Sequence, residues 1–146
     1  MKTAVILSAR KERDTDIPYP LQSFGRGLCL LDRTLAILRD NGIEKIVLVV
    51  GYRSELFQRY SEQGLIIVVN DNYQFTASMA SLALAAPYID EDFLLVESDT
   101  FYERTVVEQL IASPKRNCLS VTDESGNGDE AFVDVCNGCV CKITKD

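Results

Sequence analysis

Residues 3–7 read Thr-Ala-Val-Ile-Leu, a short, largely apolar run that is rich in β-branched side chains. Such a run is typical of a strand that is covered on both faces, as strands in parallel sheets are. A polar loop over residues 8–27 follows, and its Ile17-Pro18-Tyr19-Pro20 section is expected to be extended, because proline disfavours helix in the residue before it. The chain therefore opens with a buried strand that leads into a long loop.

Outward from this strand, strands and helices alternate. Further buried strands are expected at residues 46–50, 65–69, 93–96 and 118–121. The expected helices are one with Leu31, Leu35 and Leu38 on one stripe, one capped by Ser54, one over residues 76–86 stopped by Pro87, and one with Val106, Val107, Leu110 and Ile111 facing the core. This alternation predicts an α/β fold of three layers, Rossmann-like, with a mainly parallel sheet and helices on both faces.

The C-terminal part has a different character. Two alternating runs within residues 131–143 flank Asn137-Gly138, the strongest short signal for a hairpin turn. A C-terminal β-hairpin is therefore expected. The sequence shows no repeat, low-complexity segment or flexible linker, so residues 1–146 are expected to form a single domain.

Composition limits the chemistry. The formal net charge is −7 and the chain contains no histidine. An acidic surface repels nucleic-acid backbone and anionic lipid, so we expect neither nucleic acid nor membrane as a partner. Without histidine, catalysis must depend on carboxylates, cations, backbone amides and a hard metal ion.

The five cysteines raise the question of compartment and metal binding. The N-terminal apolar run is too short for a signal peptide, no stretch has the length of a membrane span, and an odd number of cysteines without an export signal predicts reduced thiols in the cytoplasm. Cys136, Cys139 and Cys141 also suggest a zinc site. The Asn-Gly turn explains their spacing better, because Cys136 and Cys139 flank a two-residue loop and no second cysteine pair is present.

Three polar segments follow expected strands. In open parallel sheets, ligands bind outside the carboxyl ends of the strands. The loop after Leu7, the Gly51-Tyr52 turn and Glu97-Ser98-Asp99 lie at those ends. Two carboxylates one residue apart can both approach one Mg²⁺ ion, which takes one or two protein carboxylates and completes its shell with water and phosphate. The alternative is that Asp99 only caps the turn before the next helix.

Cations follow the first strand. Arg10, Lys11 and Arg13 can bind a triphosphate, since guanidinium groups bind phosphate with two hydrogen bonds. The alternative is a solvated loop in which these charges pair with neighbouring carboxylates. Tyr73 and Tyr102 can stack on a base, although partial burial is the simpler role for both.

Several segments resemble the sugar-phosphate and choline-phosphate nucleotidyltransferases. Residues 3–9 resemble the first strand of that family, and residues 41–52 its second strand and turn. Pro18-Tyr19-Pro20-Leu21 is similar to its Pro-Lys-Pro-Leu segment, and Asn70-Asp71-Asn72-Tyr73 with Ser81-Leu82 resembles the cytidylyltransferase branch. Glu97-Ser98-Asp99 lies where the family carries its metal-binding aspartate.

The resemblance implies a reaction and a set of roles. An oxygen of a small phosphorylated alcohol, phosphonate or sugar attacks the α-phosphorus of a nucleoside triphosphate, with CTP favoured, and pyrophosphate leaves. Mg²⁺ is the implied cofactor, with Asp99 as ligand and Glu97 as second ligand, while Arg10, Lys11 and Arg13 take up phosphate charge. Gly51 and Tyr52, with the amides of Ser8 and Ala9, are expected at the nucleotide, and Ser78 stands near substrate-contacting asparagines of the cytidylyl branch.

The sequence also departs from the family. Residues 10–16 contain no glycine, the lysine of the proline motif is Tyr19, and the paired asparagines are Ala77 and Ser78. The chain ends where active relatives continue into the part that binds the acceptor, so it is expected to be the nucleotide-binding part of the family fold, with a homo-oligomer possible. Three hypotheses follow: a nucleotidyltransferase, a catalytically impaired nucleotide- or partner-binding module, and the donor half of a GT-A-type glycosyltransferase.

Overall fold

The computed structural model describes residues 1–11, 15–25, 27–124, 126 and 130–145. The chain forms two compact units, Met1–Arg116 and Asn117–Asp146. That residues 1–146 act as a single domain stays a prediction. None of the helices in the described part is long and apolar enough to cross a membrane.

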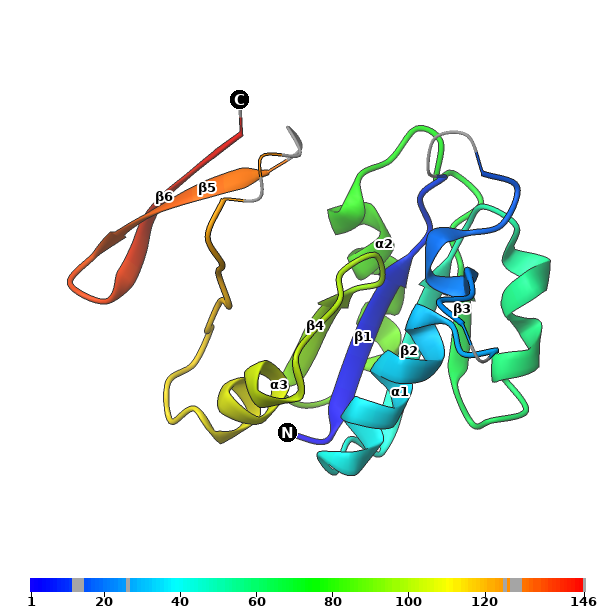
Figure 1. Ribbon diagram of the computed structural model, residues 1–146, viewed down its shortest axis with the longest axis horizontal. Helices are drawn as coiled ribbons and strands as arrows, with labels where there is room; N and C mark the ends of the chain where they lie inside the picture. Colours follow the sequence, from blue (N-terminus) through cyan, green and yellow to red (C-terminus); the bar gives the residue numbers. More distant parts are fainter. Residues whose placement is uncertain (12–14, 26, 125, 127–129, 146) are drawn as a thin grey trace. The chain divides into compact units, whose positions relative to one another are not determined.

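A four-stranded parallel sheet forms the centre of the first unit (Figure 1). Its strands are β1 (Thr3–Ser8), β2 (Lys45–Val50), β3 (Ile66–Val69) and β4 (Phe93–Glu97), in the order β3-β2-β1-β4. β1 pairs with β2 from Thr3 opposite Lys45 and with β4 from Thr3 opposite Phe93. All six residues of β1 are buried, which confirms the prediction made from its continuous apolar run.

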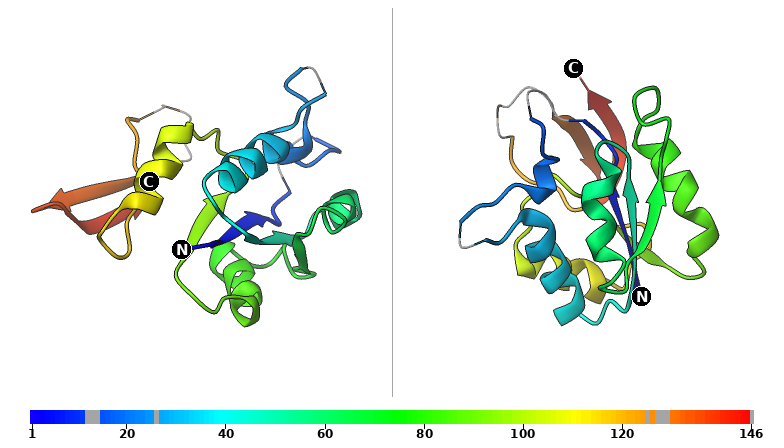
Figure 2. Two further views of the ribbon diagram at one scale, coloured as in Figure 1. Left: turned by 90° about the horizontal axis from the view of Figure 1, so that it is seen from below. Right: turned by 90° about the vertical axis from the view of Figure 1, so that its right-hand side faces the viewer.

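Helices cover both faces of this sheet, as the alternating pattern predicts (Figure 2). The first core cluster joins alternate residues of β1 and β2 to α1 (Leu30–Asp40), the 3-10 helix η2 (Ser54–Tyr60) and α3 (Arg104–Ala112). The second joins the other residues of β1 and β2 to α2 (Ser78–Ala85). Two short 3-10 helices, η1 (Tyr19–Leu21) and η3 (Ala86–Tyr88), complete the unit. The three-layer α/β fold is confirmed.

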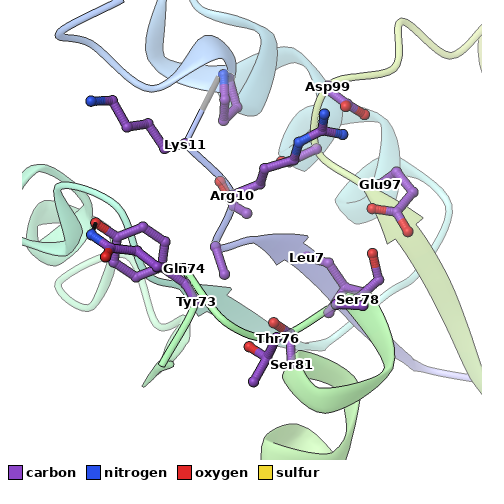
Figure 3. Close-up of a pocket in the computed structure, with 15 residues that line it drawn as sticks. Leu7, Arg10, Lys11, Tyr73, Gln74, Thr76, Ser78, Ser81, Glu97 and Asp99 are labelled. Carbon is purple, nitrogen blue, oxygen red and sulfur yellow. Dashed lines mark hydrogen bonds between the residues drawn. The ribbon is translucent and has the colours of Figure 1, made fainter. Parts of the chain in front are cut away.

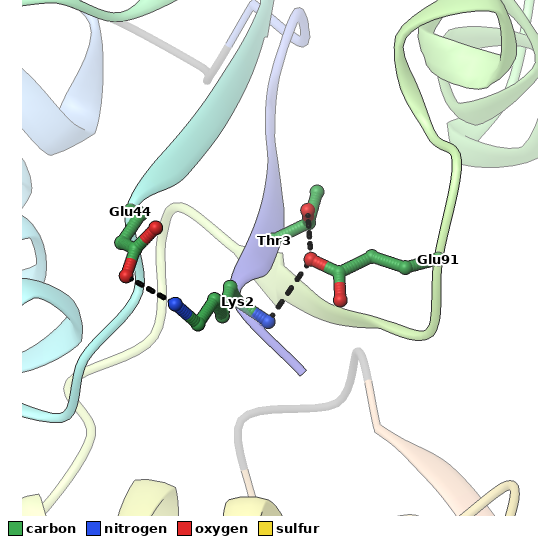
Figure 4. A network of polar contacts seen from close by, with 4 residues as sticks. All are labelled: Lys2, Thr3, Glu44 and Glu91. Carbon is green, nitrogen blue, oxygen red and sulfur yellow. Dashed lines mark hydrogen bonds and ion pairs between the residues drawn. The ribbon is translucent and has the colours of Figure 1, made fainter.

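Polar contacts fix the amino end of β1 (Figure 4). The Thr3 hydroxyl and the Lys2 backbone amide donate to the Glu91 carboxylate at 2.7 and 3.1 Å. The hydrogen bond from Thr3 lowers the pKa of Glu91. The Lys2 ammonium pairs with Glu44 at 2.6 Å, an exposed pair that adds little stability. These contacts connect the start of β1 to the segments that precede β2 and β4.

The second unit contains the predicted hairpin. β5 (Ala131–Cys136) pairs antiparallel with β6 (Cys139–Lys145), and Asn137 and Gly138 adopt φ values of 54° and 75° in the turn. The expectation that all five cysteines are reduced is wrong for two of them, because Cys136 and Cys141 form a disulfide. The register shift beside Asp134 and Val135 puts one extra residue in β6, and the Cα atoms of Cys136 and Cys141 lie 5.9 Å apart. Cys29, Cys118 and Cys139 take no part in this disulfide.

Three local predictions are wrong. Of the section expected to be extended, Tyr19 and Pro20 lie in the 3-10 helix η1, where proline is tolerated because the first turn needs no amide from it. Residues 118–121 form no strand; Leu119 and Val121 are 56% and 57% exposed, because no neighbouring strand pairs with this apolar alternation. Ser54 makes no capping hydrogen bond, because Arg53, with a left-handed φ of 51°, occupies the position before η2.

The helix predicted over residues 76–86 has different limits. It begins at Ser78, and Thr76 instead donates its hydroxyl to the Asn72 carbonyl at 3.0 Å. Pro87 does not stop the chain at Ala86 but lies inside the single turn of η3. Proline is tolerated there because the first turn of a helix leaves its amides without intrahelical partners.

Burial differs between the central strand β2 and the edge strand β4, and this difference can be tested. Leu48 in β2 is 0% exposed, whereas Leu95 in the edge strand β4 is 44% exposed. Leu48→Ala is expected to lower the free energy of unfolding by about 2–5 kcal/mol, because it leaves a cavity in the core. Leu95→Ala is the control and should cost less than half as much in urea unfolding. Equal losses would contradict the burial described for these strands.

Candidate active site

A cavity of about 540 Å³ opens at the carboxyl ends of β1 and β4 (Figure 3). Its walls come from three segments that are far apart in the sequence: Leu7–Lys11 after β1, the stretch from Tyr73 to Ser81 between β3 and α2, and Glu97–Asp99 at the end of β4. Pro20 of η1 adds to the lining. Parallel strands that end at one edge of the sheet bring these segments together.

The end of β1 forms the floor. Ser8 and Ala9 both line the cavity, and Ser8 is only 6% exposed. Its hydroxyl is buried and has no hydrogen-bond partner among the described residues. Because an unpaired buried hydroxyl is costly, this group is suited to a ligand that supplies the missing partner.

Two cations of the first loop reach the cavity. Arg10 and Lys11 both line it, and Figure 3 shows them pointing to opposite sides, with Arg10 extended toward Asp99. The Lys11 ammonium lies 5.1 Å from the centre of the Tyr52 ring. Arg13, the third predicted cation, lies outside the described residues.

The acidic tip, which we define as Glu97, Ser98 and Asp99, forms the opposite wall. The Ser98 amide donates to the Leu7 carbonyl at 3.2 Å, which keeps the tip beside the end of β1. Burial, and then the charge of Asp99, raise the pKa of Glu97. Both predicted metal ligands therefore line the same cavity, and they are close enough for one charge to affect the other.

The donor set of this tip fits a magnesium ion. Carboxylate oxygens are hard ligands, and two of them leave most of an octahedral shell for water and phosphate. Across the described part of the chain, no group of three or more His, Cys, Asp or Glu side chains is arranged to hold a metal ion. The tip is thus suited to an ion that brings phosphate with it rather than to a site closed by protein ligands alone.

Gly51 and Tyr52, both predicted at the nucleotide, do not line the cavity. They support the first loop from behind: the Tyr52 amide donates to the Ala9 carbonyl at 2.9 Å, and its hydroxyl donates to the Thr15 carbonyl at 3.3 Å. A Cβ at Gly51 would lie 2.6 Å from the Ala9 carbonyl oxygen and 2.7 Å from the Tyr73 Cβ. That either residue contacts the nucleotide stays a prediction.

The segment before α2 contributes two residues that sequence reasoning missed, Gln74 and Thr76, which line the cavity beside the predicted Ser78. Tyr73, for which stacking on a base was one of two expected roles, also lines it. Buried Asn70 organises this wall, because its side-chain amide donates to Thr76 and to Ser81 at 3.0 Å each. The Asn-Asp-Asn-Tyr sequence at residues 70–73 marked the region, but its pattern does not show which side chain faces inward.

Fold and cavity together define an α/β domain with a charged cavity at the carboxyl edge of its parallel sheet. The comparisons with known proteins identify its family. Residues 5–136 match the family model of the MobA-like NTP transferase domain. The chain belongs to this family, and the family resemblance seen in the sequence is confirmed.

Individual relatives agree with this assignment. The chain is 31% identical over 110 residues to CMP-5'-(3-aminopropyl)phosphonate synthase of Streptomyces rubellomurinus (strain ATCC 31215), a match over 72% of this chain and 17% of that protein. The inositol-1-phosphate CTP transferase of T. maritima has a TM-score of 0.74 at 23% identity, over 99% of this chain and 64% of that one. The CTP:phosphocholine cytidylyltransferase of Streptococcus pneumoniae has a TM-score of 0.72 at 22% identity, over 100% of this chain and 65% of that one. The two structural likenesses concern the fold, and the chain spans less than two thirds of each relative.

The close contact at Gly51 can be tested. Gly51→Ala is expected to lower the free energy of unfolding by about 1–3 kcal/mol, because the added methyl group overlaps the Ala9 carbonyl oxygen and the Tyr73 Cβ. The displaced loop should also weaken binding of nucleotide, measured by calorimetry. In Gly64→Ala, the control, a Cβ meets nothing within 4 Å, so binding should stay unchanged despite strain at a φ of +85°. Wild-type stability and binding in Gly51→Ala would contradict this role.

Proposed function

We propose that this chain is the nucleotide-binding part of a magnesium-dependent nucleotidyltransferase that transfers a nucleotidyl group, cytidylyl by preference, to a small phosphorylated alcohol, phosphonate or sugar, with release of pyrophosphate. The observation that carries the proposal is the gathering of opposite charges in one cavity. Arg10 and Lys11 of the first loop and the carboxylates of Glu97 and Asp99 at the end of β4 all line it. The family assignment supports the reaction type.

The roles of the residues follow from their positions. Arg10 and Lys11 neutralise phosphate oxygens on the side of the first loop, and Ser8 offers its unpaired hydroxyl to the ligand on the floor. Glu97 and Asp99 would hold the magnesium ion, which would supply positive charge for the phosphate oxygens. Ser78, Gln74 and Tyr73 line the remaining wall, where the nucleoside binds. Arg13 stays a prediction for the phosphate side.

In the reaction, an acceptor oxygen forms a bond to the α-phosphorus while the bond to the bridging oxygen of the β-phosphate breaks. A phosphate or phosphonate oxygen is already ionised at neutral pH, so no strong protein base is required. This fits a chain without histidine. The preference for CTP rests on three relatives whose names contain CMP, CTP or cytidylyl.

A catalytically impaired module is the second candidate, because residues 10–16 carry no glycine. Glycine-rich loops let backbone amides approach a triphosphate closely, and this loop offers side-chain cations instead. Calorimetry with CTP, UTP, ATP and GTP, with and without Mg²⁺, followed by pyrophosphate release with a panel of phosphorylated acceptors, separates the candidates. Binding without release favours the impaired module, tighter binding of a nucleotide-sugar favours a glycosyltransferase donor half, and no nucleotide binding would refute the proposal. A homo-oligomer and a cytoplasmic location stay predictions.

Asp99→Asn tests the ligand assignment. In this variant, the factor by which Mg²⁺ strengthens CTP binding should fall at least about 100-fold. The reason is that removal of one charge next to a divalent ion costs several kcal/mol. Asp92→Asn is the matched control, because Asp92 is exposed just before the opposite end of the same strand. Calorimetry with and without Mg²⁺ measures both variants. Unchanged Mg²⁺ dependence in Asp99→Asn would show that Asp99 is not a ligand.

The raised pKa of Glu97 predicts a pH dependence. Mg²⁺ binds the ionised carboxylate, so Mg²⁺-dependent CTP affinity is complete above the pKa of Glu97 and falls as the pH drops through it. Because this pKa lies above the ordinary value of 4.5, the fall begins at a higher pH than an ordinary carboxyl would give. Glu97→Gln should bind CTP with Mg²⁺ more weakly than the wild type. Between pH 8 and pH 4.5 its affinity should lack the fall caused by protonation of Glu97 and keep only the fall caused by protonation of the nucleotide. Parallel profiles of affinity against pH would contradict a ligand role for Glu97.

A further inference from the structure

The acidic tip depends on an exposed sheet edge. Among the strands of the described residues, β4 is the last of its sheet, so its outer backbone groups pair with none of them. The Ser98 amide donates inward to Leu7, and backbone directions alternate along a strand, so the amide and carbonyl of Glu97 face outward. At such an edge, an amide and a carbonyl need a partner other than a strand.

The hydroxyl of Tyr102 closes this edge. It accepts a hydrogen bond from the Glu97 amide at 3.1 Å and donates one to the Glu97 carbonyl at 3.2 Å. One side chain thus takes the place of a neighbouring strand at a single residue. Residues 97 to 102 form a closed loop whose two ends meet, and Asp99 lies within it.

This closed loop is anchored to the core. The Tyr102 ring packs against the core cluster that contains α1, β4 and α3 residues. The Tyr102 carbonyl accepts a hydrogen bond from the Arg33 guanidinium of α1, and the same guanidinium lies 3.9 Å from the centre of the Phe101 ring. Within the loop, the Thr100 hydroxyl donates to the Asp99 carboxylate at 3.4 Å. The position of the tip is therefore set by α1 as well as by β4.

We propose that Tyr102 is a positioning residue for metal-dependent nucleotide binding, acting through its hydroxyl on the backbone of Glu97. The inference rests on the proposed function and extends it to a residue that does not line the cavity. Mg²⁺ requires nearly ideal octahedral geometry, so a carboxylate held loosely binds it less well than one held in place. Partners of this kind typically contribute about 10- to 100-fold to metal affinity.

Tyr102→Phe is the test, because it keeps the ring in the core and removes only the hydroxyl. The Mg²⁺ concentration that gives half-maximal CTP binding is expected to rise about tenfold. CTP binding without Mg²⁺ should not change. Amide hydrogen exchange at Glu97 and Ser98, measured without metal or nucleotide, should become at least about tenfold faster, because the Glu97 amide loses its acceptor.

Tyr60→Phe is the matched control. Tyr60 is a fully buried tyrosine of the same core cluster, and its hydroxyl donates to Asp32 at 2.8 Å and accepts from Arg59 at 2.9 Å. Its loss should lower the free energy of unfolding without changing the Mg²⁺ requirement. A purely structural role for Tyr102 predicts the same result for both variants, so a shift in Tyr102→Phe alone supports positioning.

Two outcomes overturn the inference in distinguishable ways. If the wild-type chain shows Mg²⁺-dependent CTP binding and Tyr102→Phe has the same Mg²⁺ requirement and the same amide exchange at Glu97, Tyr102 does not position the tip. If the wild-type chain binds no nucleotide in the presence of Mg²⁺, the proposed function itself fails and this role fails with it.

Discussion

The burial of β1 on both faces and its pairing on both edges is the constraint on which the rest of the structure depends. Its side chains alternate between two core clusters, so α1, η2 and α3 pack on one face and α2 on the other. Its backbone is paired with β2 and β4, so the next polar residues emerge at a point where three chain segments converge. The cavity exists because the strand ends there and the chain must leave the sheet.

The cavity brings together charges of opposite sign from two segments, in a chain without histidine. Arg10 and Lys11 belong to a loop, whereas Glu97 and Asp99 belong to a strand end that is held by hydrogen bonds to Leu7 and Tyr102. The acidic wall is thus fixed by backbone pairing, and the cationic wall depends on long side chains. A polyphosphate with a metal ion is a ligand that fits such an asymmetric arrangement. The family to which the chain belongs is described as an NTP transferase domain, a name that refers to a nucleoside triphosphate.

The sequence predicted what continuous apolar runs and turn residues determine. β1, β2 and the hairpin at Asn137-Gly138 were correct because buried runs and an Asn-Gly pair have few alternative structures. Residues 118–121 carry the same alternation as a strand but find no partner, a fact that local sequence does not contain. The charged wall residues were found because strand ends converge. The inward position of Gln74, and the hydrogen bonds that join Asn70 to Thr76 and Tyr102 to Glu97, were missed because a motif does not show how the side chains in and beside it are turned. Cys136 and Cys141 were misjudged because their pairing depends on an extra residue in β6.

The contact between Gly51, Ala9 and Tyr73 has a consequence for how this sequence can change over time. A Cβ at position 51 would lie 2.6 Å from the Ala9 carbonyl oxygen and 2.7 Å from the Tyr73 Cβ, so no other residue type fits without movement of these neighbours. Position 51 therefore cannot accept a larger residue by itself, and the residue types accepted at positions 9 and 73 depend on what occupies position 51. Among descendants of this sequence, the three positions are expected to vary as a coupled set, so that a larger residue at 51 appears only with rearranged neighbours on two other segments.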